Sequence, residues 1–323
     1  MRELLLLLCQ YPFREENREP LRDQLAKVQN WTKLVGLVNA HGIIALAAYN
    51  IKESGLVKEV PADAMASLEN GYKQSMIRNL WLVERWREVN AILSDAGIKH
   101  VLLKGMALEH TLYGSKGLRQ MNDNDILIKR DEAIKAWELL QNNGYLPGIS
   151  KSAIHRKIML NIGKHLPCLF KNGYAIEIHH DLFKNNSSND PVDEAIEILI
   201  EDTKAWILSG DLQIKHLTDH FERHASEGDC QLRLYADIKL SDETSNINIE
   251  DRFIDNPIQC MNPEFMRTSY KINFRTIPVR YKLPFLLGDI FPSLEWMKNR
   301  YKCGEAKAFL YYPHRIGKLL WLI

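Results

Sequence analysis

The pattern of apolar and polar residues changes period along the chain. Residues 35–56 and 62–97 carry apolar side chains at helical spacing, and the two patterns stop at Gly55 and Gly97. Glycine just past the last periodic residue is typical of a helix end. We therefore predict a helical region over residues 1–97.

Shorter apolar runs follow. The runs at 100–104 and 125–128 are bounded by turn residues, which predicts buried strands. Residues 106–114 and 130–145 have helical periodicity. Residues 168–180 form two apolar segments joined at Asn172-Gly173, a strong signal for a β-hairpin. Together these elements predict a compact core of strands and helices.

A polar, turn-rich run at 184–191 marks the expected end of this core. Helical patterns return at 193–206, 212–226 and 230–241, and two more helices are expected around Gly304. The predicted fold class is α+β, with a small mixed β-sheet between mainly helical regions. The expected domains are a helical N-terminal region (1–97), an α/β core (98–184) and a mainly helical C-terminal domain (185–323).

Composition narrows the possible partners. The 323 residues carry a net charge of +1, so the broad Lys/Arg excess typical of nucleic-acid binders is missing and a nucleic-acid partner is not favoured. The five cysteines are scattered without a CxxC pair, which indicates reduced thiols. The apolar start, MRELLLLLCQYP, is too short for a secretion signal, and no stretch is long enough to span a bilayer. We expect a cytoplasmic protein without a membrane partner.

The run MNDNDILI at 121–128 raises the question of chemistry. Asp123 and Asp125 are two residues apart on a predicted strand, so their side chains share a face while Asn124 points to the other. Two neighbouring carboxylates repel each other unless water or a cation separates them. A solvated turn is the common explanation of such a pair, and it remains open here.

A third carboxylate lies on the second strand of the hairpin. Glu177 alternates with Ile176 and Ile178, which should face the core. If this strand lies beside 124–128, the three acids converge. Carboxylates on rigid strands suit Mg²⁺, which retains positions for substrate phosphates.

Basic residues near the acids could bind phosphate. Lys104 and Gly105 stand where a strand meets a helix, and a helix start offers free N–H groups to an anion. Arg119 precedes the acidic run and could clamp a phosphate. An ordinary turn with solvated basic residues is the alternative.

Histidines suggest two further interpretations. His216, His220 and His224 line one face of a predicted helix; packing against the core is favoured over a zinc site, because three such residues span too far for one ion. The pair His180-Asp181 superficially suggests a phosphohydrolase of the HD type. That chemistry needs the pair on a helix, whereas the sequence predicts a strand.

Several stretches resemble a known family. VLLKGMALEHTLYG, LRQMNDNDILI, NNGY and AIEIHHDLF, together with LRLYADIKL and FPSLEWMKNRY, resemble a bacterial group of uncharacterised nucleotidyltransferases. This group belongs to the superfamily related to DNA polymerase beta. The resemblance implies a nucleotidyltransferase core and extends over most of the chain.

The resemblance also implies roles for individual residues. Asp123, Asp125 and Glu177 would be the catalytic carboxylates and the ligands of Mg²⁺, as two ions, with Mn²⁺ as a substitute. Lys104 and Gly105 would lie near the phosphates of the nucleotide, where Arg119 could join them. The side of the acceptor would be lined by His179, His224 and Asp237.

Two positions depart from the superfamily pattern. Met106 follows the glycine where a serine is usual, and Asn124 stands between the aspartates where an apolar residue is usual. A catalytically degenerate nucleotide- or partner-binding protein therefore remains an alternative.

The predicted activity is transfer of an NMP from an NTP, with ATP expected, to an acceptor hydroxyl with release of pyrophosphate. The acceptor would be a small molecule or a protein. The sequence indicates neither its identity nor the oligomeric state.

Overall fold

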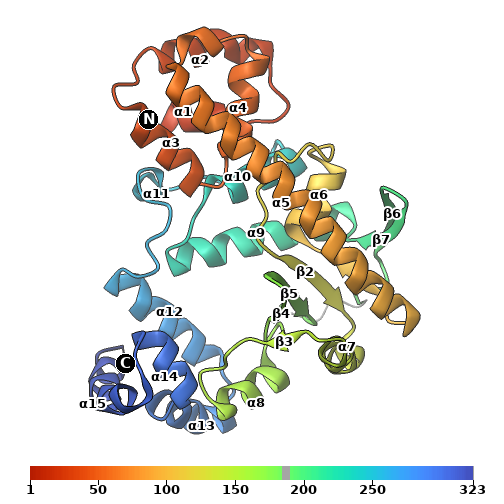
Figure 1. The fold of residues 1–323 in the computed structure, drawn as a ribbon, viewed down its shortest axis with the longest axis vertical. Helices are drawn as coiled ribbons and strands as arrows, with labels where there is room; N and C mark the ends of the chain where they lie inside the picture. Colours follow the sequence, from red (N-terminus) through yellow and green to blue (C-terminus); the bar gives the residue numbers. More distant parts are fainter. Residues whose placement is uncertain (184–189, 323) are drawn as a thin grey trace.

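The computed structural model describes residues 1–183 and 190–322, with side chains up to residue 319. A mixed seven-stranded sheet lies between helical regions formed by the two ends of the chain (Figure 1). The predicted α+β fold class is confirmed. Most of the polar run at 184–191, where the sequence places a domain boundary, lies outside the described residues, and the boundaries stay a prediction.

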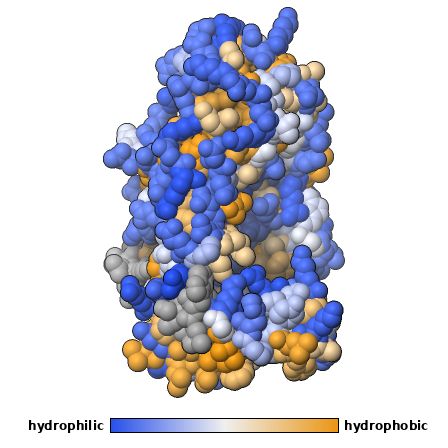
Figure 2. Space-filling model, turned by 90° about the vertical axis from the view of Figure 1, so that its left-hand side faces the viewer, coloured by the Kyte–Doolittle hydropathy of each residue, from blue (hydrophilic) through white to orange (hydrophobic). Residues whose placement is uncertain are grey.

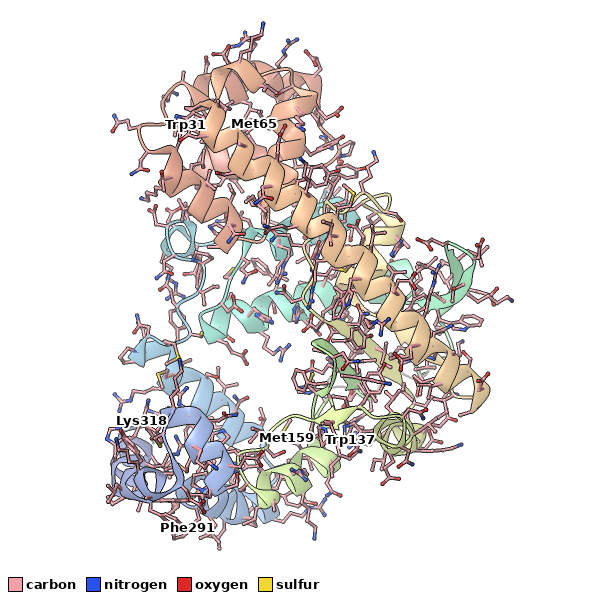
Figure 3. All side chains as sticks on the ribbon, viewed as in Figure 1. Trp31, Met65, Trp137, Met159, Phe291 and Lys318 are labelled. Atoms are coloured by element: carbon pink, nitrogen blue, oxygen red, sulfur yellow. The ribbon has the colours of Figure 1, made fainter. Side chains whose placement is uncertain are left out.

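The N-terminal helices form a common apolar core. The pattern at 35–56 predicts one helix, but the structure has two, because the chain turns at Gly42 with a φ of +68°. The long helix α5 contributes Met65 to this core (Figure 3) and then continues towards the sheet. The elements are α1 (Arg2–Leu8), η1 (Glu15–Asn17), α2 (Arg18–Leu25), α3 (Trp31–Ala40), α4 (Ile44–Glu53), η2 (Val57–Glu59) and α5 (Ala62–Asp95).

The sheet has the strand order β3-β4-β5-β2-β1-β7-β6. The pairs β2–β5 and β1–β7 are parallel, and the other neighbours are antiparallel. The predicted strands at 100–104 and 125–128 and the predicted hairpin are confirmed. The strands are β1 (His100–Leu102), β2 (Asn124–Ile128), β3 (Leu146–Pro147), β4 (Leu169–Lys171), β5 (Tyr174–His179), β6 (Ile196–Ile200) and β7 (Thr203–Ile207).

One predicted helix is wrong. Residues 193–206 have apolar residues that fit a helix, but the structure forms the antiparallel pair β6–β7 there. The β-branched Ile196, Ile198 and Ile200 alternate along β6, a spacing that a strand also satisfies. Because β7 pairs with β1, the sheet takes strands from both sides of residue 184.

The two faces of the sheet differ in chemistry. One face carries the buried side chains of Ile126, Ile128, Ile176 and Ile178, which α5 and α7 (Arg130–Asn142) cover. Trp137 of α7 packs there and donates a hydrogen bond from Nε1 to the carbonyl oxygen of Pro167 at 2.9 Å (Figure 3). This apolar face fixes which side chains of β2 and β5 point to the opposite face.

The remaining helices surround the sheet and build the C-terminal part. The buried Asp289 ties this part to the core through Lys151 and through His155, whose Nε2 lies 3.4 Å from its carboxylate. Two terminal helices separated near Gly304 are confirmed. The helices are α6 (Lys104–Thr111), α8 (Ala153–Ile162), α9 (Gly210–Glu227), α10 (Leu232–Ser241), α11 (Asp251–Ile254), α12 (Pro263–Thr276), α13 (Val279–Ile290), α14 (Leu294–Tyr301) and α15 (Glu305–Leu322).

Within the described residues, no helix combines the length and the apolar character needed to cross a membrane.

Trp86 tests how far the packing of α5 supports the sheet. Its side chain is fully buried in the core between α5 and the sheet, so Trp86→Ala should lower the free energy of unfolding by about 3–5 kcal/mol. The exposed Ile77 of the same helix is the control, and Ile77→Ala should change it by less than about 0.5 kcal/mol. Urea unfolding of both variants measures the difference; equal effects would contradict this packing.

Candidate active site

The centre of the candidate site is a pair of carboxylates on neighbouring strands. In the parallel ladder of β2 and β5, Asp125 is directly opposite Glu177. Potential ligand atoms of Asp125, Glu177 and His179 all lie within 4.8 Å of one another. The three side chains point away from the isoleucine face, because strand residues alternate. The structure thus brings together two of the three expected carboxylates and a histidine expected on the acceptor side.

Asp123 lies at the edge of this group. It precedes β2, its side chain is exposed, and it is not part of the 4.8 Å cluster. Loss of hydration and repulsion from Asp125 nevertheless raise the pKa of Asp123 above its ordinary value. The two aspartates therefore repel each other, and a bound cation would reduce this repulsion.

Two basic groups offset the charge of Asp125. Its Oδ1 atom lies 3.1 Å from Lys104 Nζ and 2.8 Å from His179 Nε2. Burial raises the pKa of Asp125, but Lys104 and the hydrogen bond from His179 outweigh it and hold that pKa well below its ordinary value.

His179 also connects Asp125 to Glu177. Its Nε2 atom lies 3.2 Å from a carboxylate oxygen of Glu177. Burial opposes the charged imidazole, but hydrogen bonds to the two carboxylates raise the pKa of His179 above its ordinary value. A protonated imidazole at this position would balance part of the negative charge of the two acids.

The turn at Lys104-Gly105 brings the first residues of α6 beside β2. Lys104 has a φ of +48°, a strained conformation for a residue with a side chain. A Cβ atom on Gly105 would lie 2.9 Å from Cγ of Met121 and 3.1 Å from Nη1 of Arg119. The glycine therefore permits close packing of α6 on the loop before β2.

Arg119 is buried in an ion pair with Asp237 of α10. Its Nη2 atom donates to Asp237 Oδ2 at 2.7 Å, and its Nε atom lies 3.1 and 3.2 Å from the two carboxylate oxygens. Tyr113 donates a further hydrogen bond to Asp237 at 3.0 Å. These contacts place Arg119 and Asp237 inside the protein, where they hold the loop before β2 against α10.

Arg233 is a basic residue near the site that the sequence prediction missed. It lies on α10, and its Nη1 atom donates to the carbonyl oxygen of Gln120 at 3.1 Å. Its buried Nε atom has no hydrogen-bond partner in the described part of the chain. Burial lowers the pKa of Arg233 to about 10, and Asp123 is among the acids that raise it. The segment LRLYADIKL contains this residue, but the sequence alone does not show that α10 passes beside the loop of Asp123.

Asn124 fits the core despite its polarity. Its side chain is fully buried on the isoleucine face, where Nδ2 donates to the hydroxyl of Tyr174 at 3.0 Å and to the carbonyl oxygen of Leu82 at 3.3 Å. The buried Oδ1 atom has no hydrogen-bond partner among the described residues, so the amide is paired on its Nδ2 side alone, which costs less than a fully unpaired amide. The departure from the apolar pattern therefore leaves β2 intact.

The three histidines of α9 form a row of rings. Centroids of His216 and His220 are 6.2 Å apart, and those of His220 and His224 are 4.2 Å apart. Burial lowers the pKa of His216 to about 3, with the charge of Lys104 as the next cause, so this imidazole is neutral. His224 Nδ1 lies 3.2 Å from Asp229. The preference for packing over a zinc site at these histidines stays a prediction.

The pair His180-Asp181 follows β5 and is not on a helix. This pair therefore lacks the helical setting that an HD phosphohydrolase needs.

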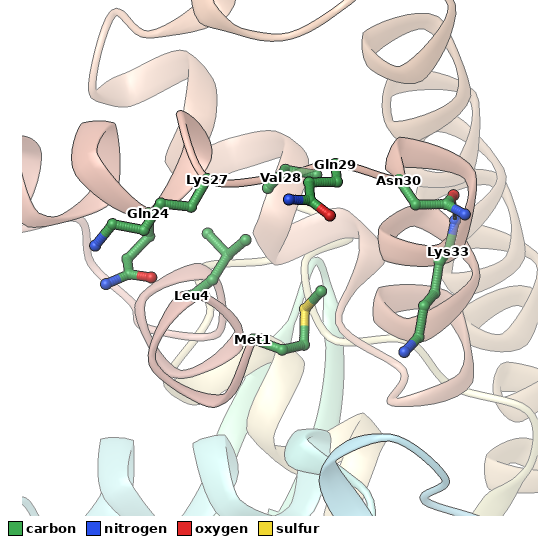
Figure 4. A pocket seen from close by; sticks show the side chains of 8 residues that line it. All are labelled: Met1, Leu4, Gln24, Lys27, Val28, Gln29, Asn30 and Lys33. Carbon is green, nitrogen blue, oxygen red and sulfur yellow. Dashed lines mark hydrogen bonds between the residues drawn. The ribbon is translucent and has the colours of Figure 1, made fainter.

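A surface pocket in the N-terminal region lies apart from these residues (Figure 4). It has a volume of about 220 Å³ and contains no carboxylate, so it offers no comparable chemistry. Its lining residues are Met1, Leu4, Gln24, Lys27, Val28, Gln29, Asn30 and Lys33.

The fold and these paired acids fit the class of nucleotidyl-transferring enzymes. The sequence model of a family described as uncharacterised nucleotidyltransferase matches residues 27–253. This range is more than half of the chain, so the chain belongs to that nucleotidyltransferase family. No curated protein matches the chain at a significant level.

The buried pair of Arg119 and Asp237 should be important for stability. Asp237→Ala leaves a buried guanidinium and the hydroxyl of Tyr113 without their acceptor, so the free energy of unfolding should fall by about 3–5 kcal/mol. The exposed pair of Lys204 and Glu197 is the control, and Glu197→Ala should cost less than about 1 kcal/mol. Denaturant unfolding compares them; an Asp237→Ala cost no greater than that of Glu197→Ala would contradict this assignment.

Proposed function

We propose that this protein transfers an NMP from an NTP to an acceptor hydroxyl and releases pyrophosphate. The observation that carries the proposal is the direct pairing of Asp125 with Glu177 across β2 and β5. Membership of a nucleotidyltransferase family supports the reaction class. The resemblance to enzymes related to DNA polymerase beta supports the finer assignment.

The donor set fits Mg²⁺. Asp125 and Glu177 supply hard oxygen atoms within one small group, and Asp123 adds a third carboxylate at its edge. Mg²⁺ uses few protein carboxylates and keeps several positions for water and phosphate. When bound, Mg²⁺ would offset the charge of the triphosphate and of the leaving pyrophosphate. We propose Asp123, Asp125 and Glu177 as its ligands, with one or two ions and with Mn²⁺ as a substitute.

The basic residues would orient the triphosphate. Lys104 forms an ion pair with Asp125 at 3.1 Å. When a cation binds Asp125 instead, Lys104 would be free to pair with a phosphate. Arg233 adds a second cation beside the loop of Asp123, with an unpartnered Nε donor within the described chain. Arg119 would act indirectly, because its guanidinium is engaged by Asp237.

The bond changes follow from this placement. The acceptor oxygen forms a bond to the α-phosphorus while the bond from that phosphorus to the bridging oxygen of pyrophosphate breaks. Glu177 would hold the cation beside the acceptor hydroxyl, and the proton of that hydroxyl would pass to water. His179, which bonds both acids, would hold Glu177 and Asp125 in position on the acceptor side.

Magnesium-dependent nucleotide binding tests the role of Asp125. Titration of the full chain with a non-hydrolysable ATP analogue should show binding with Mg²⁺ that weakens at least tenfold in Asp125→Asn. With EDTA the variant and the parent should bind alike, because the carboxylate acts through the cation. Isothermal titration calorimetry measures both affinities.

Asp131→Asn is the matched control, since Asp131 is an exposed acid at the start of α7 on another part of the surface. It should bind like the parent. Nucleotide binding that depends on neither Mg²⁺ nor Asp125 would contradict the transferase and favour the degenerate binding protein.

Arg233 should contribute mainly to binding of the terminal phosphates. Arg233→Met should weaken the Mg²⁺-ATP analogue about tenfold, because one charge-assisted contact to phosphate is lost. The affinity for AMP should change much less. Equal losses for both ligands would indicate that Arg233 acts only by holding the fold, and thermal unfolding of the variant provides the check.

A further inference from the structure

The end of the molecule formed by α13 and α15 exposes large apolar side chains. On α13, Val279 and Leu283 are 83% and 67% exposed, and their spacing of four residues puts them on one side of the helix. Leu310 of α15 is 77% exposed, and Phe291, just after α13, is 65% exposed. Figure 2 shows hydrophobic residues gathered along this lower end, where Figure 3 places Phe291. Contiguous exposed apolar surface of this kind marks a binding surface.

The same part of the chain carries a strong positive charge. Residues 263–323 contain eleven Lys or Arg and four Asp or Glu, although the whole chain has a net charge of only +1. One of the four acids, Asp289, is buried. Leaving Arg267 aside, the ion pairs found for residues 263–319 in the described chain all involve Asp289. Apart from Arg267, the exposed cations of this region therefore have no carboxylate partner among the described residues.

Cations border the apolar side chains directly. Arg280 precedes Leu283 by three residues on α13, and Lys307 precedes Leu310 by three residues on α15. Residues three apart lie on the same side of a helix. The two helices are neighbours, so their cations and apolar side chains belong to one end of the protein.

We propose that this α13–α15 end binds the surface of an anionic lipid membrane. The apolar side chains would enter the boundary between headgroups and acyl chains, and Arg280 and Lys307 would pair with lipid phosphates. An anionic membrane therefore binds both the apolar side chains and the cations of this surface. Nucleic acid would pair with the cations but leave the apolar side chains in water, and a second copy would bring two like-charged surfaces together.

This mode of binding needs no membrane-spanning helix. The expectation that the protein has no membrane partner rests on the absence of a long apolar segment, which does not bear on a peripheral surface. The surface also lies outside residues 27–253, which the nucleotidyltransferase family model matches. Membrane binding and nucleotidyl transfer can therefore be tested separately.

Vesicle flotation with the full chain tests this surface. The protein should float with vesicles of phosphatidylcholine containing about one third phosphatidylglycerol, and much less with phosphatidylcholine alone. High salt should weaken binding, because it screens the cations. The double variant Leu283→Glu/Leu310→Glu should bind at least tenfold more weakly. Arg280→Gln/Lys307→Gln should lose roughly 25-fold, about fivefold for each cation near an anionic surface.

The matched control is Ile77→Glu on α5, because Ile77 is also 67% exposed but lies on another element. It should float like the parent, and circular dichroism should show that all variants are folded. Nucleotide affinity should be the same in the parent and the Leu283→Glu/Leu310→Glu variant.

Two outcomes would overturn the proposal. One is no binding to anionic vesicles at low salt. This outcome includes a parent protein that binds single-stranded RNA instead, or one that forms a dimer which Leu283→Glu/Leu310→Glu dissociates. The other is equal vesicle binding by the parent and both double variants.

Discussion

The parallel pairing of β2 with β5 is the constraint on which the candidate site depends. Its register sets Asp125 opposite Glu177, and a shift by one residue would turn one of these acids towards the apolar face. The burial of Ile126, Ile176 and Ile178 under α5 and α7 prevents such a shift. The hydrophobic core thereby holds like charges close together, although those charges alone would separate.

The chain compensates this charge from several elements. Lys104 comes from the start of α6, His179 from β5 and Arg233 from α10. The buried pair of Arg119 and Asp237 connects α10 to the loop before β2. The site thus depends on contacts between segments more than 100 residues apart. A substitution that disturbs α10 should therefore also shift the loop before β2 and the carboxylates that follow it.

Sequence patterns predicted the elements of the core well, because their signals are local. Gly97 at the end of the 62–97 pattern, the Asn172-Gly173 turn and the alternation around Glu177 each depend on neighbouring residues in the sequence alone. The helix expected at 193–206 was wrong. The apolar residues there fit both the helical and the strand period, and the strand forms because β7 pairs with β1 and β6 pairs with β7. The position of Arg233 and the burial of Arg119 arise from the packing of α10 on the loop, which no local pattern reports. For the same reason, the sequence did not predict that Arg119 pairs with Asp237, and its expected phosphate contact stays a prediction.

We propose that Asp125 and Glu177 hold one cation between adjacent strands. A crystal structure of the full chain with Mn²⁺ and a non-hydrolysable NTP tests it most directly, because the anomalous signal of manganese locates the ion. We predict a peak bound by oxygen atoms of both Asp125 and Glu177, at about 2.1 Å if it occupies the Mg²⁺ site, with the triphosphate on the same ion. Manganese bound elsewhere, or a nucleotide seated away from β2 and β5, would contradict the account.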